Sequence, residues 1–365
     1  MLFCHWVGVR IFCCVVLLLQ FAGSGLAQKA ANLESFEIVW STVRDRHPDP
    51  KLNGLDWAAI HDETRPRIAA AQSIGEVRAI LREMLAKLGS SHYAIIPKDR
   101  YEPTQDTPAI TEKHIEVPAQ PETPVTPHAP AVKPDSAPVQ PDSAGPPPET
   151  SDKMVSFGNL PQMRLTFKSR MLPGGIGYIG FNEFLDPVSI MPQFEAAVHV
   201  FAKAPGIVLD LRGNPGGIGI MAMGIAGFFI DKPGRKLGEM KMRDSTLKFV
   251  IFPRAEVYKG SLAILVDGGS ASTTEILAQG LQDLNRARIF GTRTAGAALP
   301  SDIVRLPNGD GFQYAQASYT SDKGRVLEGS GVTPDVEVRQ TEEAQSSGHD
   351  LVIDAAADWI RSQQR

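Results

Sequence analysis

Apolar positions recur at helical spacing over the first part of the chain. From Leu33 to Leu88 they come three or four residues apart, as the buried face of an amphipathic helix requires. We therefore predict a small helical region over residues 28–100. Its last helix is expected to end at Gly89, because glycine tolerates the positive φ of a helix C-terminus. The segment "SSHYAIIP" that follows is expected to be extended, which puts His92 just beyond a helix end.

The pattern changes after residue 155 to short apolar runs that alternate with helical ones. The extended runs are "GGIGYIGF", "GIVLDLRGNPGG", "LAILVDGG" and "ARIFGTRT", and helical patterns lie between them. Alternation of strands with helices indicates an α/β core around a largely buried sheet. We assign this core to residues 156–340 and a C-terminal helix or tail to residues 341–365.

Residues 101–155 separate the two patterned regions. Of the 28 prolines in the chain, 13 fall between Tyr101 and Thr150, with almost no aromatic residue among them. Such a composition cannot bury enough apolar surface to fold, which predicts a proline-rich disordered linker. His114 and His128 lie in this segment and are expected to be solvated.

The first 27 residues have the pattern of an export signal. An arginine precedes the apolar run "IFCCVVLLL", and small residues follow it before Gln28. The run is shorter than the ~20 residues that a membrane-spanning helix needs. We predict cleavage after Ala27 and a periplasmic or secreted protein without a stable membrane span. All three cysteines lie in this segment, so the mature chain is expected to have no disulfide, cysteine nucleophile or cysteine metal site.

The net charge of the chain is -4 over 365 residues, which gives no basic surface for nucleic acid. No metal and no organic cofactor is predicted. His199 lies on an apolar helical segment, where a packed or partly exposed histidine is expected rather than a ligand.

The stretch "DGGSASTTEIL", from Asp267 to Leu277, follows one predicted strand and begins a helix. Ser272 and Glu275 fit the S-x-x-E capping box, in which both side chains satisfy free backbone N–H groups. A serine in this place is also suited to be a nucleophile, because N–H groups at a helix start, here that of Thr273, can stabilise an oxyanion. The local sequence permits both interpretations.

A second glycine-rich turn, "DLRGNPGG", ends another predicted strand at the same edge of the sheet. Gly216 and Gly217 can offer exposed N–H groups there. An ordinary turn between a strand and a helix fits the same residues equally well.

Four motifs in order, "GIVLDLRGNPGG", "LVDGGSASTTEILAQGLQD", "GTRTAG" and "VLEGSGVTPDVEV", resemble the core of the C-terminal-processing, or tail-specific, serine proteases. The earlier "LAKLGSSHY" and its helices are similar to the tricorn-core and retinoid-binding-protein branch. The resemblance covers most of residues 33–100 and 160–340. It implies that Ser272 is the nucleophile and that Ser270 is a turn residue.

The same resemblance implies that Gly217 and Thr273 donate to the oxyanion, with Gly216 supporting the turn. The PDZ-like module that the processing proteases commonly carry between helical region and core is not apparent, since the proline-rich segment occupies that interval. Recognition of a free C-terminus is therefore in doubt, and short peptides or unfolded tails are the expected substrates.

The general base departs from the processing-protease pattern. That branch uses a lysine, and Ala297 stands in its place in "GTRTAGA". Arg293 cannot replace the lysine, because a guanidinium remains protonated. The tricorn-like branch instead implies a histidine and a glutamate, which fall on His92 and Glu328, with Ser91 as a supporting residue. An imidazole that takes the serine proton and a carboxylate that stabilises the imidazolium suit this chemistry.

We therefore expect an exported serine endopeptidase that hydrolyses peptides or unfolded protein tails through a Ser–His–Glu arrangement. Two alternatives stay open. One is a catalytically inactive protein that binds a peptide or another ligand on the same fold, and the other is a hydrolase of non-peptide esters. The sequence leaves the oligomeric state and the natural substrate open.

Overall fold

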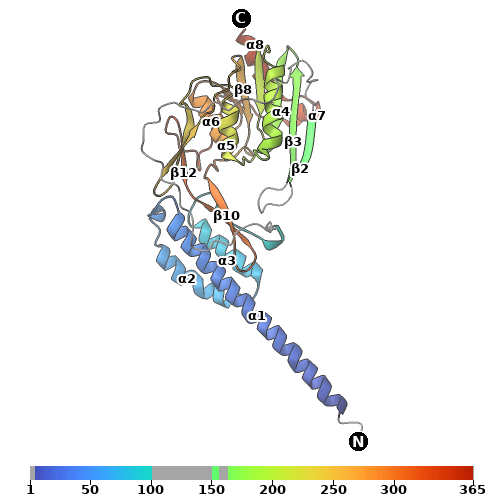
Figure 1. Cartoon of the computed structure of the whole chain (residues 1–365), viewed down its shortest axis with the longest axis vertical. Coiled ribbons are helices and arrows are strands. Elements are labelled where there is room, and N and C mark those ends of the chain that lie inside the picture. Colours follow the sequence, from blue (N-terminus) through green and yellow to red (C-terminus); the bar gives the residue numbers. More distant parts are fainter. Residues whose placement is uncertain (1–4, 101–149, 156–162, 365) are drawn as a thin grey trace, which may run out of the picture.

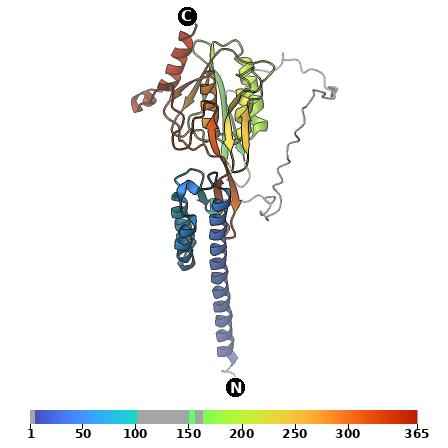
Figure 2. The ribbon, with the colours of Figure 1, turned by 90° about the vertical axis from the view of Figure 1, so that its left-hand side faces the viewer.

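The computed structural model describes residues 5–100, 150–155 and 163–364, with side chains from Leu26 onward. Figure 1 shows two parts along its long axis, a set of helices at the N-terminal end and a sheet flanked by helices at the other. Turning the molecule by 90° keeps the two parts separate (Figure 2). The predicted N-terminal helices and the central sheet are both present.

Three helices and two short 3-10 turns form the N-terminal region. They are α1 (His5–Arg46), η1 (Leu52–Gly54), α2 (Trp57–Ala70), α3 (Ile74–Ala86) and η2 (Lys98–Arg100). Asp56 and Ser73 cap α2 and α3 by accepting hydrogen bonds from backbone N–H groups of the first turn. The predicted export signal falls in the first half of α1, and its removal stays a prediction. No helix in the described residues is long and apolar enough to cross a membrane.

The central sheet has seven strands in the order β13-β9-β8-β5-β4-β3-β2. Their bounds are β2 (Thr150–Val155), β3 (Met163–Leu172), β4 (Ile176–Phe181), β5 (Gly206–Asp210), β8 (Ser261–Val266), β9 (Arg288–Gly291) and β13 (Val336–Glu337). The strands from β13 to β4 are parallel, whereas β3 and β2 are antiparallel additions. The parallel strands therefore bring their C-terminal ends to one edge.

Helices cover both faces of this sheet. On one face, α4 (Pro187–Val200), α5 (Gly219–Ala226) and α6 (Thr273–Asp283) enclose the largest apolar core. On the other, α8 (Leu351–Ser362), preceded by α7 (Glu342–Ser346), packs on β5, β8 and β9. Strands buried on both faces carry almost no polar residue, as β4 and β8 illustrate.

Two three-stranded antiparallel sheets complete the fold. One has the order β12 (Ser318–Ser321), β6 (Lys236–Lys241), β7 (Thr246–Val250), and the other β1 (Ala94–Ile96), β11 (Gly311–Ala315), β10 (Ser301–Arg305). In the second sheet, β1 of the helical region pairs with β11, so that Ile95 lies opposite Phe312. The pairing fixes the position of His92, which lies just before β1.

An ion pair strengthens the contact between the helices and the β10–β11 hairpin. The Arg78 guanidinium donates to both carboxylate oxygens of Asp310, at 2.9 and 2.7 Å, and the Lys98 N–H donates to the same carboxylate at 2.8 Å. Asp310 is completely buried. Phe312 and Tyr314 of the hairpin belong to the apolar core of the helices. The catalytic candidates of the two regions are thereby held in one body.

The predicted linker is corrected at its C-terminal end. Residues 150–155, which we assigned to the linker, form the edge strand β2 and pair with β3. Only Val155 of this strand is buried, so its composition resembles that of a solvated segment and the sequence gives little sign of a strand. The rest of the predicted linker, residues 101–149 with His114 and His128, lies outside the described residues.

Candidate active site

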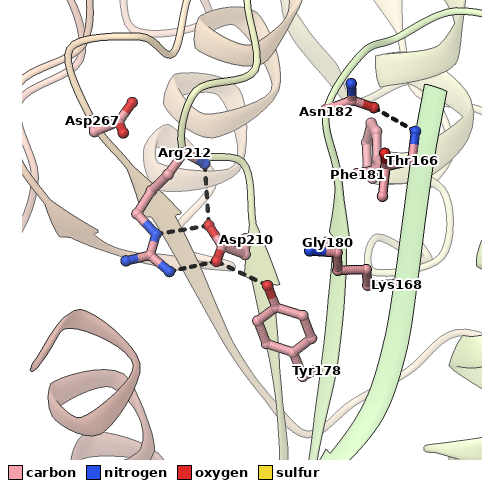
Figure 3. Close-up of a pocket in the computed structure, with 9 residues that line it drawn as sticks. All are labelled: Thr166, Lys168, Tyr178, Gly180, Phe181, Asn182, Asp210, Arg212 and Asp267. Carbon is pink, nitrogen blue, oxygen red and sulfur yellow. Dashed lines mark hydrogen bonds and ion pairs between the residues drawn. The ribbon is translucent and has the colours of Figure 1, made fainter. Parts of the chain in front are cut away.

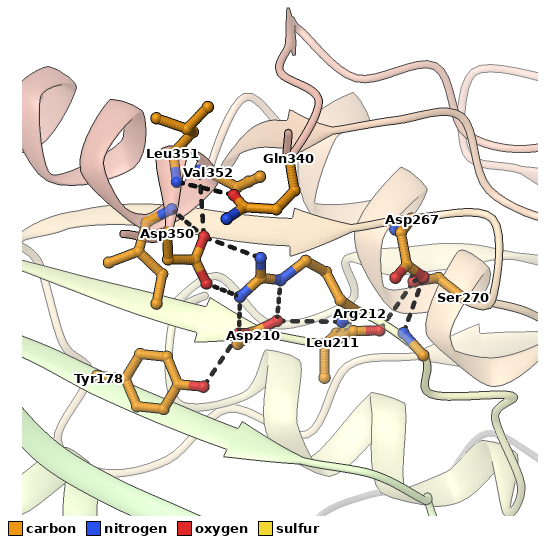
Figure 4. Close-up of polar contacts among 12 residues, drawn as sticks. Tyr178, Asp210, Leu211, Arg212, Asp267, Ser270, Gln340, Asp350, Leu351 and Val352 are labelled. Carbon is orange, nitrogen blue, oxygen red and sulfur yellow. Dashed lines mark hydrogen bonds and ion pairs between the residues drawn. The ribbon is translucent and has the colours of Figure 1, made fainter. Parts of the chain in front are cut away.

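The "DLRGNPGG" segment leaves β5 at the C-terminal edge of the sheet, where an ion-pair network fixes its first residues. Tyr178 donates to the Asp210 carboxylate at 3.0 Å, and the Arg212 guanidinium donates to it at 2.9 and 2.6 Å (Figure 3). Arg212 also donates to Asp350, at 3.0 and 2.7 Å (Figure 4). Asp350 in turn caps α8 through the N–H groups of its first turn.

Next to this network is a polar cavity of about 420 Å³. It is lined by Thr166, Lys168, Tyr178, Gly180, Phe181, Asn182, Asp210, Arg212 and Asp267 (Figure 3). The lining includes none of the predicted catalytic residues. Because Arg212 is already paired with two carboxylates, the network acts as a support that joins the start of the glycine-rich turn to the C-terminal helix.

Asn214 connects this turn to the segment that carries Ser272. Its side chain is completely buried. The amide nitrogen donates to the Phe181 carbonyl at 2.9 Å, and the amide oxygen accepts from the Gly216 N–H at 2.9 Å and from the Thr274 hydroxyl at 3.1 Å. The Asn214 carbonyl accepts from the Ala271 N–H at 3.0 Å. Asn214 therefore joins the two loops through both its buried side chain and its carbonyl.

Gly216 and Gly217 adopt backbone conformations that only glycine takes readily, with φ of 99° and 135°. A Cβ on Gly216 would lie 2.8 Å from the Thr273 nitrogen, and a Cβ on Gly217 would lie 2.4 Å from the Phe184 oxygen. The Thr273 hydroxyl donates to the Gly217 carbonyl at 2.7 Å. The two predicted oxyanion donors are thus neighbours. Within the described chain, neither the Gly217 N–H nor the Thr273 N–H donates to a backbone or side-chain acceptor.

Two serines precede α6, and their environments differ. Ser270 is completely buried, and its hydroxyl donates to the Leu211 carbonyl at 2.8 Å and accepts from the Asp267 N–H at 3.0 Å (Figure 4). Its oxygen is used to hold the turn. Ser272 is partly exposed and lies directly before the first residue of α6.

Ser272 has a strained backbone, with φ of 54° and ψ of -119°. Such conformations cost about 1–3 kcal/mol and persist where the surroundings determine them. The Ser272 N–H donates to the Ala297 carbonyl at 2.9 Å and to the Glu275 carboxylate at 3.0 Å. The glutamate of the predicted capping box is therefore in contact with the Ser272 backbone.

Glu275 does more than the capping motif requires. It is completely buried, and its carboxylate accepts from the N–H groups of Ser272, Gly296 and Ala297 and from the Thr294 hydroxyl, at 3.0, 2.8, 2.9 and 2.5 Å. Thr294, Gly296 and Ala297 belong to the "GTRTAGA" segment at the end of β9. Glu275 therefore ties the Ser272 turn to a loop that follows the neighbouring strand.

His92 is linked to Glu328 through Ser91. The Glu328 carboxylate accepts from the Ser91 N–H at 2.6 Å and from the Ser91 hydroxyl at 3.0 Å, and the Ser91 oxygen lies 2.6 Å from His92 Nδ1. Because the Ser91 hydroxyl has one proton and donates it to Glu328, it accepts a hydrogen bond from Nδ1–H. This assignment leaves Nε2 of His92 as the unprotonated nitrogen.

The loop after β9 connects these groups to Ser272. The Ala297 carbonyl accepts a hydrogen bond from the Ser272 N–H, and the N–H of the next residue, Ala298, donates to the Glu328 carboxylate at 3.2 Å. Ser272 and Glu328 therefore contact the same loop, and His92 is connected to it only through Ser91 and Glu328. No hydrogen bond joins His92 to Ser272 in the described part of the chain. Such catalytic hydrogen bonds are often long without substrate and tighten when it binds.

Burial lowers the pKa of His92 below its ordinary value, and the negative charge of Glu328 opposes this shift. The imidazole is therefore neutral at ordinary pH, as a general base requires. Arg293 is exposed, and its guanidinium donates to the Ser330 carbonyl at 3.5 Å. His199 is also exposed, and no group of three or more potential ligand residues within the described ranges could hold a metal ion.

Two protein-family models match this chain. Residues 175–338 match Peptidase family S41, and residues 28–86 match the Tricorn protease C1 domain. A carboxy-terminal-processing protease of Bartonella bacilliformis is 31% identical over 192 residues, which are 49% of this chain and 42% of that protein. The chain thus spans less than half the length of this curated relative.

Solved structures share the fold. A lipoprotein from Streptococcus agalactiae has a TM-score of 0.58 at 16% identity, and the match covers 92% of this chain and 96% of the lipoprotein chain. The tricorn protease has a TM-score of 0.56 at 14% identity, and the match covers 92% of this chain and 37% of the tricorn chain. From the two sequence matches, residues 175–338 of the chain belong to peptidase family S41, and residues 28–86 form an N-terminal region of the tricorn C1 type.

Proposed function

We propose that this protein is a serine endopeptidase that hydrolyses peptide bonds in peptides or unfolded protein tails. The observation that carries the proposal is the pair of free N–H groups, those of Gly217 and Thr273, beside Ser272. A pair of donors in this position stabilises the oxyanion of a tetrahedral intermediate. A protein that only binds peptides has no need of such a pair next to a strained serine.

The proposed reaction gives each group of the site one role. Nε2 of His92 removes the Ser272 hydroxyl proton while the oxygen attacks the substrate carbonyl, and the two N–H groups donate hydrogen bonds to the developing oxyanion. The Nδ1–H of the imidazolium stays bonded to Ser91, which is bonded to Glu328. His92 then donates its proton to the leaving amine, and water hydrolyses the acyl-enzyme with His92 again as base.

The nucleophile is tested by labelling the mature protein with a fluorophosphonate and mapping the modified residue. We expect modification of Ser272, and loss of labelling and peptide hydrolysis in the folded Ser272→Ala protein. Ser270→Ala is the matched control, because it removes a hydroxyl from the same turn, and it should retain at least part of both activities. Equal hydrolysis by wild type and Ser272→Ala would refute the assignment.

The same preparation distinguishes the alternatives. A catalytically inactive binding protein would bind peptides without being labelled. An esterase would cleave simple esters and leave every member of a peptide library intact. We expect hydrolysis of peptides, because the Ser91–Glu328 contacts hold an imidazole able to protonate an amine leaving group.

We also propose that the protein is exported to the periplasm or the medium. The support is the arginine, apolar run and small-residue sequence of residues 1–27. N-terminal sequencing of the protein from separated cell fractions should find Gln28 as the first residue outside the cytoplasm. A full-length chain found in the cytoplasm alone would contradict this proposal.

A further inference from the structure

A second cavity lies beside the oxyanion turn, because Ile218, which follows Gly217, lines it. It has a volume of about 340 Å³ and is lined by Lys153, Met154, Val155, Leu185, Asp186, Pro187 and Ile218. Three elements contribute to it: the edge strand β2, the start of α4 with the residues before it, and the residue that precedes α5. No residue of this lining belongs to the catalytic group described above.

The backbone connects this cavity directly to the oxyanion donor. Phe184 and Gly217 form a parallel β-bridge, in which the Ile218 N–H donates to the Phe184 carbonyl at 2.7 Å and the Phe184 N–H donates to the Gly216 carbonyl at 2.8 Å. The next residue on each side of the bridge, Leu185 and Ile218, lines the cavity. A substrate whose carbonyl oxygen occupies the oxyanion site is therefore only one residue away from the cavity wall.

The chemistry of the lining favours an apolar side chain. Five of the seven lining residues are apolar, and Val155 and Leu185 are buried. The two charged members neutralise each other, because Lys153 Nζ lies 2.9 Å from the Asp186 carboxylate. A charged substrate side chain would find no free counter-ion there and would lose its hydration.

We propose that this cavity is a specificity subsite, which binds an aliphatic side chain of the substrate next to the scissile bond. The proposal rests on the peptidase function proposed above. A leucine or methionine side chain that leaves water for this cavity should raise kcat/KM roughly 10–100-fold over alanine at that position. The selected substrates are then peptides and unfolded tails cut beside aliphatic residues.

The test measures kcat/KM on internally quenched peptides in which each position flanking the scissile bond carries Leu, Ala, Asp or Lys. We expect wild type to prefer Leu at one of the two positions. Ile218→Ala should reduce this preference at least threefold while the rate of fluorophosphonate labelling of Ser272 stays unchanged. Ile220→Ala is the matched control, because Ile220 lies two positions further on, is 55% exposed and does not line the cavity.

A second variant reverses the charge of the rim. The Lys153 side chain is 61% exposed, so Lys153→Glu is expected to fold, and it leaves two carboxylates at the cavity. The ratio of Leu to Lys preference should fall at least fivefold in this protein. Unchanged preferences at both flanking positions in Ile218→Ala and Lys153→Glu would overturn the subsite, as would a wild-type preference for Asp or Lys. A wild-type protein without labelling or hydrolysis would overturn the proposed function and the subsite with it.

Discussion

Replacing Glu275 by glutamine tests whether this buried carboxylate holds Ser272, the proposed nucleophile, in place. The carboxylate accepts four hydrogen bonds, three from N–H groups and one from the Thr294 hydroxyl. An amide of the same shape has one oxygen, and its nitrogen carries two protons. Two of the four donors would then face another donor in a completely buried site.

The magnitude follows from the two lost contacts. A hydrogen bond to a charged group contributes about 1.5–3 kcal/mol, so Glu275→Gln should lower the free energy of unfolding by about 3–6 kcal/mol. This is a large part of the about 5–15 kcal/mol of a typical domain. Because the Ser272 N–H is one of the donors, the strained turn should also relax, and we expect kcat/KM to fall at least tenfold in protein that is still folded.

Urea denaturation followed by far-UV circular dichroism measures the stability, and fluorophosphonate labelling measures the reactivity of Ser272. Glu76→Gln is the matched control. Glu76 also stands three residues after a serine cap, Ser73, and accepts the Gln72 N–H at 2.8 Å, but it is exposed. Its replacement should change stability and labelling little. A Glu275→Gln protein with less than about 1 kcal/mol of destabilisation and wild-type labelling would refute the reasoning.

Three further measurements test other parts of the structure. Because burial lowers the pKa of His92, kcat/KM should rise with pH through an ionisation below the ordinary value of about 6.5. His92→Ala should lower kcat/KM about 10²–10⁴-fold. A pH profile of kcat/KM with its half-maximum above pH 7 would contradict this. Burial raises the pKa of Glu183 from 4.5 to about 7, so the folded protein binds the proton of this carboxyl group more tightly than the unfolded chain does. The contribution of Glu183 to the free energy of unfolding therefore falls as the pH rises from 4.5 to about 7. Glu183→Gln should therefore stabilise the protein more at pH 8 than at pH 4, by about 1–2 kcal/mol once partial exposure is taken into account; an equal effect at both pH values would count against it. Arg78→Met leaves the buried Asp310 carboxylate without its ion-pair partner and should lower the free energy of unfolding by about 3–5 kcal/mol. The control Arg67→Met breaks an exposed ion pair and should leave the melting temperature nearly unchanged. Similar melting temperatures for both variants would show that the Arg78–Asp310 pair does not hold the two regions together.

The elements that the sequence predicts well are those with a local pattern. The run before "DGGSAS" is apolar enough for a buried strand, and the residues after Ser272 have helical spacing, so β8 and α6 were expected close to their observed bounds. The turn with Gly216 and Gly217 is equally local. No local pattern identified the proposed general base, because His92 and Glu328 were connected only through the family resemblance.

The residues that sequence reasoning missed depend on contacts between distant segments. The β10–β11 hairpin carries a turn signal in Asn308 and Gly309, but nothing nearby indicates that β1 would join it. The capping motif identified Glu275 but not its contacts with the loop after β9. Asn214 was quoted only as part of a glycine-rich turn, and its contacts depend on the position of Thr274.

The pairing of β1 with β11 has a consequence for the synthesis of the protein. Ser91 and Glu328, which in the proposed mechanism orient the base together, are 237 residues apart in the chain. A ribosome releases the N-terminal helices first and the hairpin that receives β1 much later. Until then His92 has no fixed neighbour, and the chain carries a base that cannot reach its serine. If the protein has the proposed peptidase function, a growing or prematurely terminated chain is unable to cut the unfolded chains around it, and hydrolysis begins only when the C-terminal third has folded onto the helices.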